Sequence, residues 1–200
     1  MNDFYSIQTQ TGWRHALESF VHWCDPPPGR LVLDVGCGPG LFIQLLRQRG
    51  CFAWGVDLEE DELRQIQPDP LCAVADALFL PFPAQTFQML TASNLLFFIG
   101  DPVAVLREMA RLALPGGQVC LLNPSERMSL ESAESLVQQR DLQGIARRSL
   151  LDWARRAENH QRWNDAEMEA LYSQAGLMLL ESTLKIGPGL ARFTRGLKPA

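Results

Sequence analysis

Short apolar runs alternate with amphipathic segments through the first two thirds of the chain. Runs rich in β-branched and aromatic residues are followed by segments in which apolar residues recur every three or four positions, the spacing of a helix face. This alternation predicts a parallel sheet with helices on both faces. The predicted strands cover residues 30–35, 51–57, 71–75, 86–92 and 117–122, and the predicted helices cover residues 40–49, 59–66 and 102–113.

The pattern changes at the two ends of the chain. Trp13, Leu17 and Phe20 recur at helical spacing ahead of the first strand, and the proline-rich stretch 25–29 ends that helix. Near the carboxyl end, the glycine and proline turn at residues 187–189 predicts an antiparallel hairpin. The elements expected there are a helix at 166–174 and strands at 177–186 and 190–195.

Residues 125–163 are too long for a simple strand-to-helix connection and predict two helices, at 128–140 and 142–158. An insertion after the fifth strand would cover the carboxyl edge of the sheet, so we expect a substrate lid. The second helix carries four arginines at helical spacing, either as a solvated basic face or to attract an anionic substrate. Aromatic residues that could belong either to the core or to an apolar pocket are Phe97, Phe98, Trp153 and Trp163.

Length and charge narrow the class of partner. Two hundred residues fit one domain, and a formal net charge of −5 argues against nucleic acid, whose binding needs a basic surface. The five cysteines form no C-x-x-C pair and have no histidine at ligand spacing, so neither a disulfide framework nor a metal site is expected. With no apolar run of membrane-spanning length and no leader pattern at the first residues, we expect a cytoplasmic protein that binds a small molecule.

The stretch LVLDVGCGPG at residues 31–40 carries the most specific chemical signal. A strand ends at Asp34, and Gly36, Gly38 and Gly40 follow before a helix opens. Glycines at this spacing let the backbone turn tightly and approach a ligand, with helix N–H groups directed at it. A dinucleotide fingerprint needs its third glycine one residue later, so the spacing disfavours NAD and FAD. The stretch predicts a nucleotide-type cofactor site.

The segment Asp34-Val35-Gly36-Cys37-Gly38-Pro39-Gly40 resembles motif I, D-x-G-x-G-x-G, of the class I S-adenosylmethionine-dependent methyltransferases. Residues 30–124 are similar to the methyltransferase type 11 group, which is related to enzymes of ubiquinone and menaquinone biosynthesis. The resemblance implies S-adenosylmethionine as cofactor. It also implies an α/β, Rossmann-like fold with a seven-stranded, mostly parallel sheet, one antiparallel strand, helices on both faces and a helical lid after the fifth strand.

Two further carboxylates end apolar runs. Asp57 follows the second predicted strand, where an acid can accept both hydroxyls of a ribose, and Asp76 follows the third. The family implies that an acid at the latter position accepts the adenine amino group, and that groups at the end of the fourth strand, around Asn94, hold the amino-acid end of the cofactor. The predicted cofactor-binding residues are Asp34, Gly36, Cys37, Gly38, Gly40, Asp57, Leu58, Asp76, Ala77 and Asn94.

The resulting prediction is methyl transfer by in-line displacement to a small acceptor that is anionic or partly apolar, with the acceptor atom left open. A non-catalytic S-adenosylmethionine-binding sensor or partner subunit is the alternative, and an arsenite methyltransferase a lesser one. No catalytic residue is predicted; Tyr5, His15, His22 and His160 are candidate bases by position only. The expected parts are an N-terminal cap (1–29), a cofactor-binding core (30–124), the lid (125–163) and a C-terminal helix with the hairpin (164–200).

Overall fold

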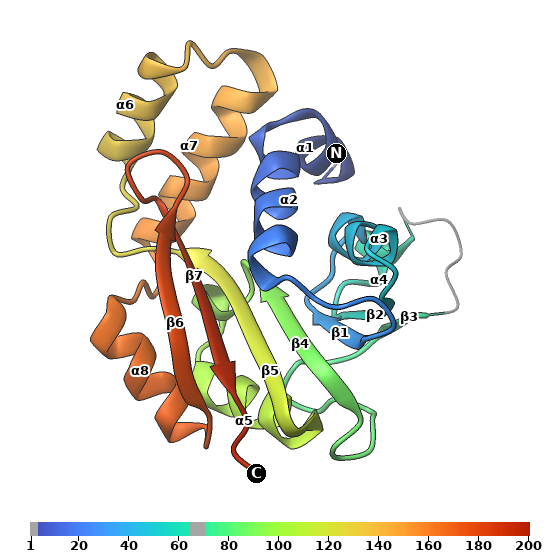
Figure 1. The fold of residues 1–200 in the computed structure, drawn as a ribbon. Helices are drawn as coiled ribbons and strands as arrows, with labels where there is room; N and C mark the ends of the chain where they lie inside the picture. The colour runs from blue at the N-terminus through green and yellow to red at the C-terminus, as the bar shows by residue number, and fades with distance from the viewer. Residues whose placement is uncertain (1–3, 65–70) are drawn as a thin grey trace.

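The computed structural model describes residues 4–64 and 71–200. Its centre is a seven-stranded sheet with the order β3-β2-β1-β4-β5-β7-β6 (Figure 1). All neighbouring pairs from β3 to β5 are parallel, whereas β7 runs antiparallel to both β5 and β6. The strands are β1 (Leu31–Val35), β2 (Phe52–Asp57), β3 (Cys72–Val74), β4 (Phe87–Ser93), β5 (Ala113–Pro124), β6 (Met178–Lys185) and β7 (Ala191–Leu197). The predicted fold class, including the single reversed strand and the final hairpin, is confirmed.

Helices cover both faces of the sheet because the chain adds strands first on one side of β1 and then on the other. It runs outward from β1 to β2 on one side and from β4 to β5 on the other, so right-handed crossovers put α3 and α5 on opposite faces. None of the helices in the described residues is long and apolar enough to cross a membrane. The helices are α1 (Phe4–Gln10), α2 (Gly12–Cys24), α3 (Leu41–Gln48), α4 (Glu60–Leu63), η1 (Leu96–Phe98), α5 (Pro102–Leu112), α6 (Leu130–Gln139), α7 (Gly144–Glu158) and α8 (Asp165–Gln174).

The helix predicted ahead of the sheet is α2, which is anchored by an aromatic cluster. The ring of Phe20 lies 5.2 Å from that of Phe42 on α3 and 5.0 Å from that of Phe193 on β7. Phe20 is fully buried, and burying a side chain of this size stabilises the fold by about 1.5–3 kcal/mol. Thr11 caps the helix by accepting a hydrogen bond from the Trp13 N–H at 3.2 Å. This packing places α1 and the start of α2 beside the carboxyl ends of the strands.

Three elements differ from the sequence prediction. The helix expected at 59–66 is the short α4, and the end of that expected range lies outside the described residues. The fifth strand begins at Ala113 because that residue pairs with Phe87, and a register shift then precedes the main pairing from Gln118 onward. The segment before α2 forms the helix α1, which no apolar periodicity of its own predicted.

Residues 125–163 contain the predicted helix pair, α6 and α7, which stands beside α1 and α2 (Figure 1). The base of this segment is held by Arg192 on β7, whose side chain is 3% exposed. Its guanidinium donates to the Trp163 carbonyl at 3.1 Å and to Glu126 at 2.8 Å, and it also contacts Asp165. A buried cation with this many acceptors fixes both ends of the insertion to the sheet.

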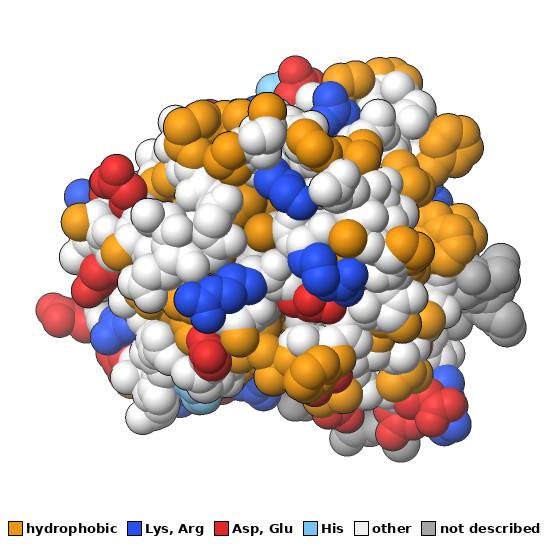
Figure 2. Space-filling view, turned by 90° about the horizontal axis from the view of Figure 1, so that it is seen from below, with side chains coloured by type: hydrophobic (Ala, Val, Ile, Leu, Met, Phe, Trp, Pro, Cys, Tyr) orange, Lys and Arg blue, Asp and Glu red, His pale blue; other side chains and the backbone are white. Residues whose placement is uncertain are grey.

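Charged side chains of both signs share the face on which β4 begins. On the described part of that face, Lys and Arg side chains lie among acidic and apolar ones (Figure 2). A mixed surface of this kind is typical of a solvent-facing side. The elements that carry the predicted ligand chemistry end at the opposite edge, where the parallel strands have their carboxyl ends.

Candidate cofactor and acceptor site

The glycine loop after β1 has the backbone conformation that its sequence predicts. Gly36, Gly38 and Gly40 all have positive φ, at 73°, 50° and 74°. A Cβ on Gly36 would lie 3.1 Å from Cδ1 of Leu95, so a side chain there would meet both steric crowding and an unfavourable φ. Gly40 is the N-cap residue of α3. The loop thus brings bare backbone to the edge of the sheet.

Asp57 at the end of β2 fixes this loop with one carboxylate oxygen. Its Oδ2 accepts a hydrogen bond from the Gly38 N–H at 2.7 Å, and its Oδ1 accepts one from the Glu59 N–H at 3.0 Å. A carboxylate has about four lone-pair sites, so both oxygens keep the capacity to accept a hydroxyl hydrogen bond. The side chain is therefore suited to hold a ribose diol while it shapes the loop.

Asp34 on β1 is a nearly inaccessible carboxyl group at the wall of the site. It is 1% exposed, and Thr91 on the neighbouring strand β4 donates a hydrogen bond to its Oδ1 at 2.7 Å. Burial raises the pKa of Asp34 to about 7, the Thr91 hydrogen bond opposes the rise, and the negative charge of Asp57 adds to it. A cationic ligand group placed beside this carboxyl group would favour its ionised form.

The end of β4 supplies a polar side chain in an unusual backbone conformation. Asn94 has φ +58°, a conformation that Asn tolerates better than most residues, and its N–H donates to the Leu122 carbonyl at 2.7 Å. Its side-chain Oδ1 is buried without a hydrogen-bond partner among the described residues. An orphaned acceptor of this kind has a free-energy cost of about 1–3 kcal/mol, which a ligand donor would remove.

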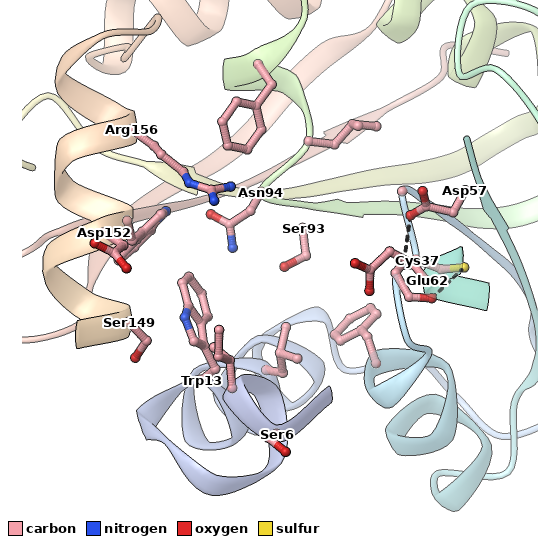
Figure 3. Close-up of a pocket in the computed structure, with 18 of the residues that line it drawn as sticks. Ser6, Trp13, Cys37, Asp57, Glu62, Ser93, Asn94, Ser149, Asp152 and Arg156 are labelled. Carbon is pink, nitrogen blue, oxygen red and sulfur yellow. Dashed lines mark hydrogen bonds between the residues drawn. The ribbon is translucent and has the colours of Figure 1, made fainter. Parts of the chain in front are cut away.

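These groups line one cavity of about 670 Å³, within the usual range for a small-molecule site. At one end are the glycine loop, Asp57 and Glu62 of α4; at the other is the face of α7 that carries Asp152 and Arg156 (Figure 3). Trp13 of α2 closes the side between them, and its ring makes an edge contact with Trp153 of α7 at 4.6 Å. Residues 125–163 and the N-terminal helices therefore meet at the cavity.

Some of the predicted cofactor-binding residues line the cavity, and others lie outside its wall. Asp34, Gly36, Cys37, Gly38, Asp57 and Asn94 line the cavity. Gly40, Leu58, Asp76 and Ala77 lie outside its wall, and Leu58 is 62% exposed. The parallel pairing of Asp57 with Val74 nevertheless brings the end of β3 and the following Asp76 to the same sheet edge as Asp57. Their roles stay predictions.

Several lining residues were not predicted from the sequence. They are Ser6 and Gln10 of α1, Glu62 of α4, and Ser149 and Asp152 of α7. Their spacing on α7 is that of one helix face, but a polar face is also typical of an ordinary solvent-exposed helix. Only the packing of α7 against α1 shows that this face is directed inward.

Cys37 is the cysteine that lines the cavity. A hydrogen bond with Cys72, together with burial, raises the pKa of the Cys37 thiol far above its usual range. Because the thiolate is the nucleophilic form, this group is held as an inert thiol. All five cysteines are free, and Cys37 supplies no activated sulfur to the cavity.

The candidate histidine bases do not line the cavity. None of the three histidines, all of them in the described part of the chain, lines the cavity. His22 Nδ1 is 3.0 Å from an Arg49 nitrogen, and His160 Nδ1 is 2.7 Å from the Arg156 carbonyl oxygen. The Tyr5 side chain lies outside the described residues. The geometry therefore assigns no catalytic base.

Comparison with known proteins matches residues 33–121 to the family described as the methyltransferase domain. A ubiquinone biosynthesis O-methyltransferase of Pseudomonas fluorescens (strain SBW25) is 35% identical over 111 residues, which are 50% of this chain and 47% of the relative. The chain thus spans about half the length of the curated relatives it matches.

Solved structures share the fold over nearly the whole chain. A chain in the complex between the Haloferax volcanii Trm112 methyltransferase activator and the putative methyltransferase has a TM-score of 0.70 at 20% identity, covering 98% of this chain and 93% of that one. Magnesium protoporphyrin IX methyltransferase from Synechocystis PCC 6803 with bound S-adenosylhomocysteine has a TM-score of 0.66 at 16% identity, covering 94% and 84%. Residues 33–121 thus match the methyltransferase domain family of the type 11 group, and nearly the whole chain has the fold of the class I S-adenosylmethionine-dependent methyltransferases.

Proposed function

We propose that this protein transfers a methyl group from S-adenosylmethionine to a small-molecule acceptor. The observation that carries the proposal is the single cavity that joins the glycine loop and two carboxyl groups, Asp34 and Asp57, to a second end walled by α7. The first end suits a cationic nucleoside cofactor, and the second leaves space for the molecule to be methylated. The family match supports the same cofactor.

The residues of the first end fit the parts of that cofactor. Asp57 retains lone pairs for a ribose diol, the backbone of Gly36 and Gly38 allows close approach, and Asp34 offers a carboxyl group to the ammonium of the amino-acid end. We place the adenine beside Asp76 at the neighbouring strand end. When bound, S-adenosylmethionine supplies an electrophilic methyl group that carries its own leaving group.

The protein's own contribution to the reaction is orientation and exclusion of water. Trp13 and Trp153 approach each other across the cavity, so α2 and α7 together limit solvent access to the space between them. We propose that residues 125–163 act as the substrate lid and that the N-terminal helices act as the cap. No histidine lines the cavity. We therefore propose that the lining binds the acceptor, and we assign no residue as a catalytic base.

The side chains that line the cavity also indicate the chemical character of the acceptor. Aromatic side chains of Trp13, Trp153, Phe97 and Phe98 border the cavity and favour a partly apolar molecule. Arginines of α7 in the same wall favour an anionic one.

Calorimetry with S-adenosylmethionine, S-adenosylhomocysteine and NAD tests the cofactor assignment. Binding of NAD at comparable affinity, without binding of the sulfonium cofactor, would refute it. Incubation with methyl-labelled cofactor and a fractionated lysate then tests transfer. Cofactor binding without label transfer to any fraction would favour the non-catalytic sensor or partner subunit instead.

A further inference from the structure

The two ends of the cavity carry opposite charge. The carboxylates of Asp57 and Glu62 line the loop end, whereas two arginines, Arg148 and Arg156, and one carboxylate, Asp152, line the lid end. Low-dielectric walls focus the field of each charged group into the cavity, so each end attracts a ligand group of opposite charge. The acidic end matches the cationic groups of the proposed cofactor. The basic end then belongs to the second ligand, the methyl acceptor.

The two arginines at the lid end are available to that ligand. Arg148, Asp152 and Arg156 are spaced four residues apart on α7 and so share one face of the helix. The Asp152 carboxylate accepts a hydrogen bond from Arg155 at 2.7 Å, and among the ion pairs of the described residues neither Arg148 nor Arg156 appears. Figure 3 shows the Arg156 side chain directed toward Asn94 over the cavity.

A buried hydrogen-bond donor on the same helix lacks a partner. Trp153 lines the cavity and is 7% exposed, and its Nε1–H has no acceptor among the described residues. An indole nitrogen can only donate, so its partner must be an oxygen or another acceptor atom. Two guanidinium groups and one N–H donor, all on α7 and all from residues that line the cavity, form a donor set typical of oxyanion recognition.

Aromatic side chains also border the lid end of the cavity. Phe97 and Phe98 have ring centroids 3.8 Å apart, and Phe98 is 40% exposed. Together with the Trp13–Trp153 pair they form surfaces on which a flat apolar group can pack. The donors and the rings thus border the same end of the cavity.

We infer that the methyl acceptor is a small flat, apolar compound bearing a carboxylate or similar oxyanion, held by Arg148, Arg156 and the Trp153 N–H. This inference rests on the proposed function, since it assigns the acidic end to the cofactor. Its rival is that Arg156 holds the carboxylate of the cofactor itself. The rival assignment predicts a loss of S-adenosylhomocysteine affinity in Arg156→Gln, whereas our inference predicts none.

The test uses two probes of equal shape, para-trifluoromethylbenzoate and its neutral amide, para-trifluoromethylbenzamide. Fluorine NMR measures their dissociation constants for the full chain saturated with S-adenosylhomocysteine. We expect the benzoate to bind about tenfold more tightly than the benzamide. The double variant Arg148→Gln/Arg156→Gln should reduce that preference to about twofold or less. Trp153→Phe keeps an aromatic ring but removes the N–H, and should weaken benzoate binding about tenfold.

Arg147→Gln is the matched control. It removes the same charge from the adjacent position of α7, outside the cavity lining, and should leave the benzoate preference unchanged. The thermal unfolding midpoint of each variant reports on folding, and calorimetry reports on S-adenosylhomocysteine affinity, which should stay within about twofold of the parent.

Equal affinity for both probes, no binding of the benzoate at millimolar concentration, or an unchanged preference in the double variant would overturn the inference. A loss of S-adenosylhomocysteine affinity in Arg156→Gln would overturn it in favour of the rival assignment. Failure of the parent chain to bind S-adenosylhomocysteine would instead refute the proposed function, so the two failures are distinguishable.

Discussion

Asp34→Asn should stabilise the fold, and the gain should grow with pH. The native carboxyl group is 1% exposed, and its burial raises the pKa to about 7, whereas an aspartate in the unfolded chain has a pKa near 4. A difference of about three between these pKa values corresponds to about 4 kcal/mol of unfolding free energy when the group is fully ionised in both states. The Asn amide oxygen can accept the Thr91 hydrogen bond at 2.7 Å that the carboxylate now accepts.

The direction of this pH dependence follows from the number of protons that the folded and unfolded states bind. Between about pH 4 and pH 7 the folded protein retains the Asp34 proton and the unfolded chain has lost it, so the unfolding free energy of the parent falls as pH rises. Above about pH 7 both states are ionised and the loss reaches its limit. Because Asn does not titrate, the stability difference between variant and parent should increase by about 2.5 kcal/mol from about pH 5 to about pH 8.

Urea denaturation followed by tryptophan fluorescence measures this difference at a series of pH values, and the linear dependence on denaturant gives each unfolding free energy. Asp61→Asn is the control, because that carboxylate is 89% exposed and its removal should leave the pH dependence of the parent unchanged. A constant difference between Asp34→Asn and the parent across this pH range would refute the assignment of a proton to the buried carboxyl group.

Four further predictions concern ligand binding. Affinity for S-adenosylmethionine should rise with pH between about 5 and 7, because the cationic cofactor favours ionised Asp34, and calorimetry should find this rise flattened in Asp34→Asn. Asp57→Ala should weaken cofactor binding by about 1.5–3 kcal/mol in calorimetry without loss of folding, and Asp61→Ala should not; unchanged affinity would exclude Asp57 as the ribose acid. Gly38→Val should abolish cofactor binding, because a branched side chain is strained at φ +50° and would occupy the ligand's space; full affinity in calorimetry would show that the loop does not touch the cofactor. Residues 125–163 and the N-terminal helices should gain protection from hydrogen exchange when cofactor and acceptor are both bound, whereas equal protection in the free protein would indicate a preformed pocket.

The order of elements and the cofactor loop could be read from the sequence because both depend on neighbouring residues. The apolar run before Asp34 and the glycines after it specify a strand and a turn whatever surrounds them, and the hairpin at residues 187–189 is set by its own turn chemistry. The short α4 and the early start of β5 were missed because tertiary pairing decides them. Ala113 is a strand residue through its pairing with Phe87, which lies 26 positions earlier.

The fold class, the glycine loop and the strand-end acids could be predicted from sequence pattern and family resemblance, whereas the protonation and direction of individual side chains depend on tertiary packing. Arg147 and Arg148 are adjacent and chemically identical, yet Arg148 alone of the two lines the cavity, because α7 packs against α1 with that face inward. The pKa of Asp34 is raised to about 7 because the strands on both sides bury its carboxyl group. Such properties arise from distances between segments far apart in the chain, and local sequence pattern does not encode those distances.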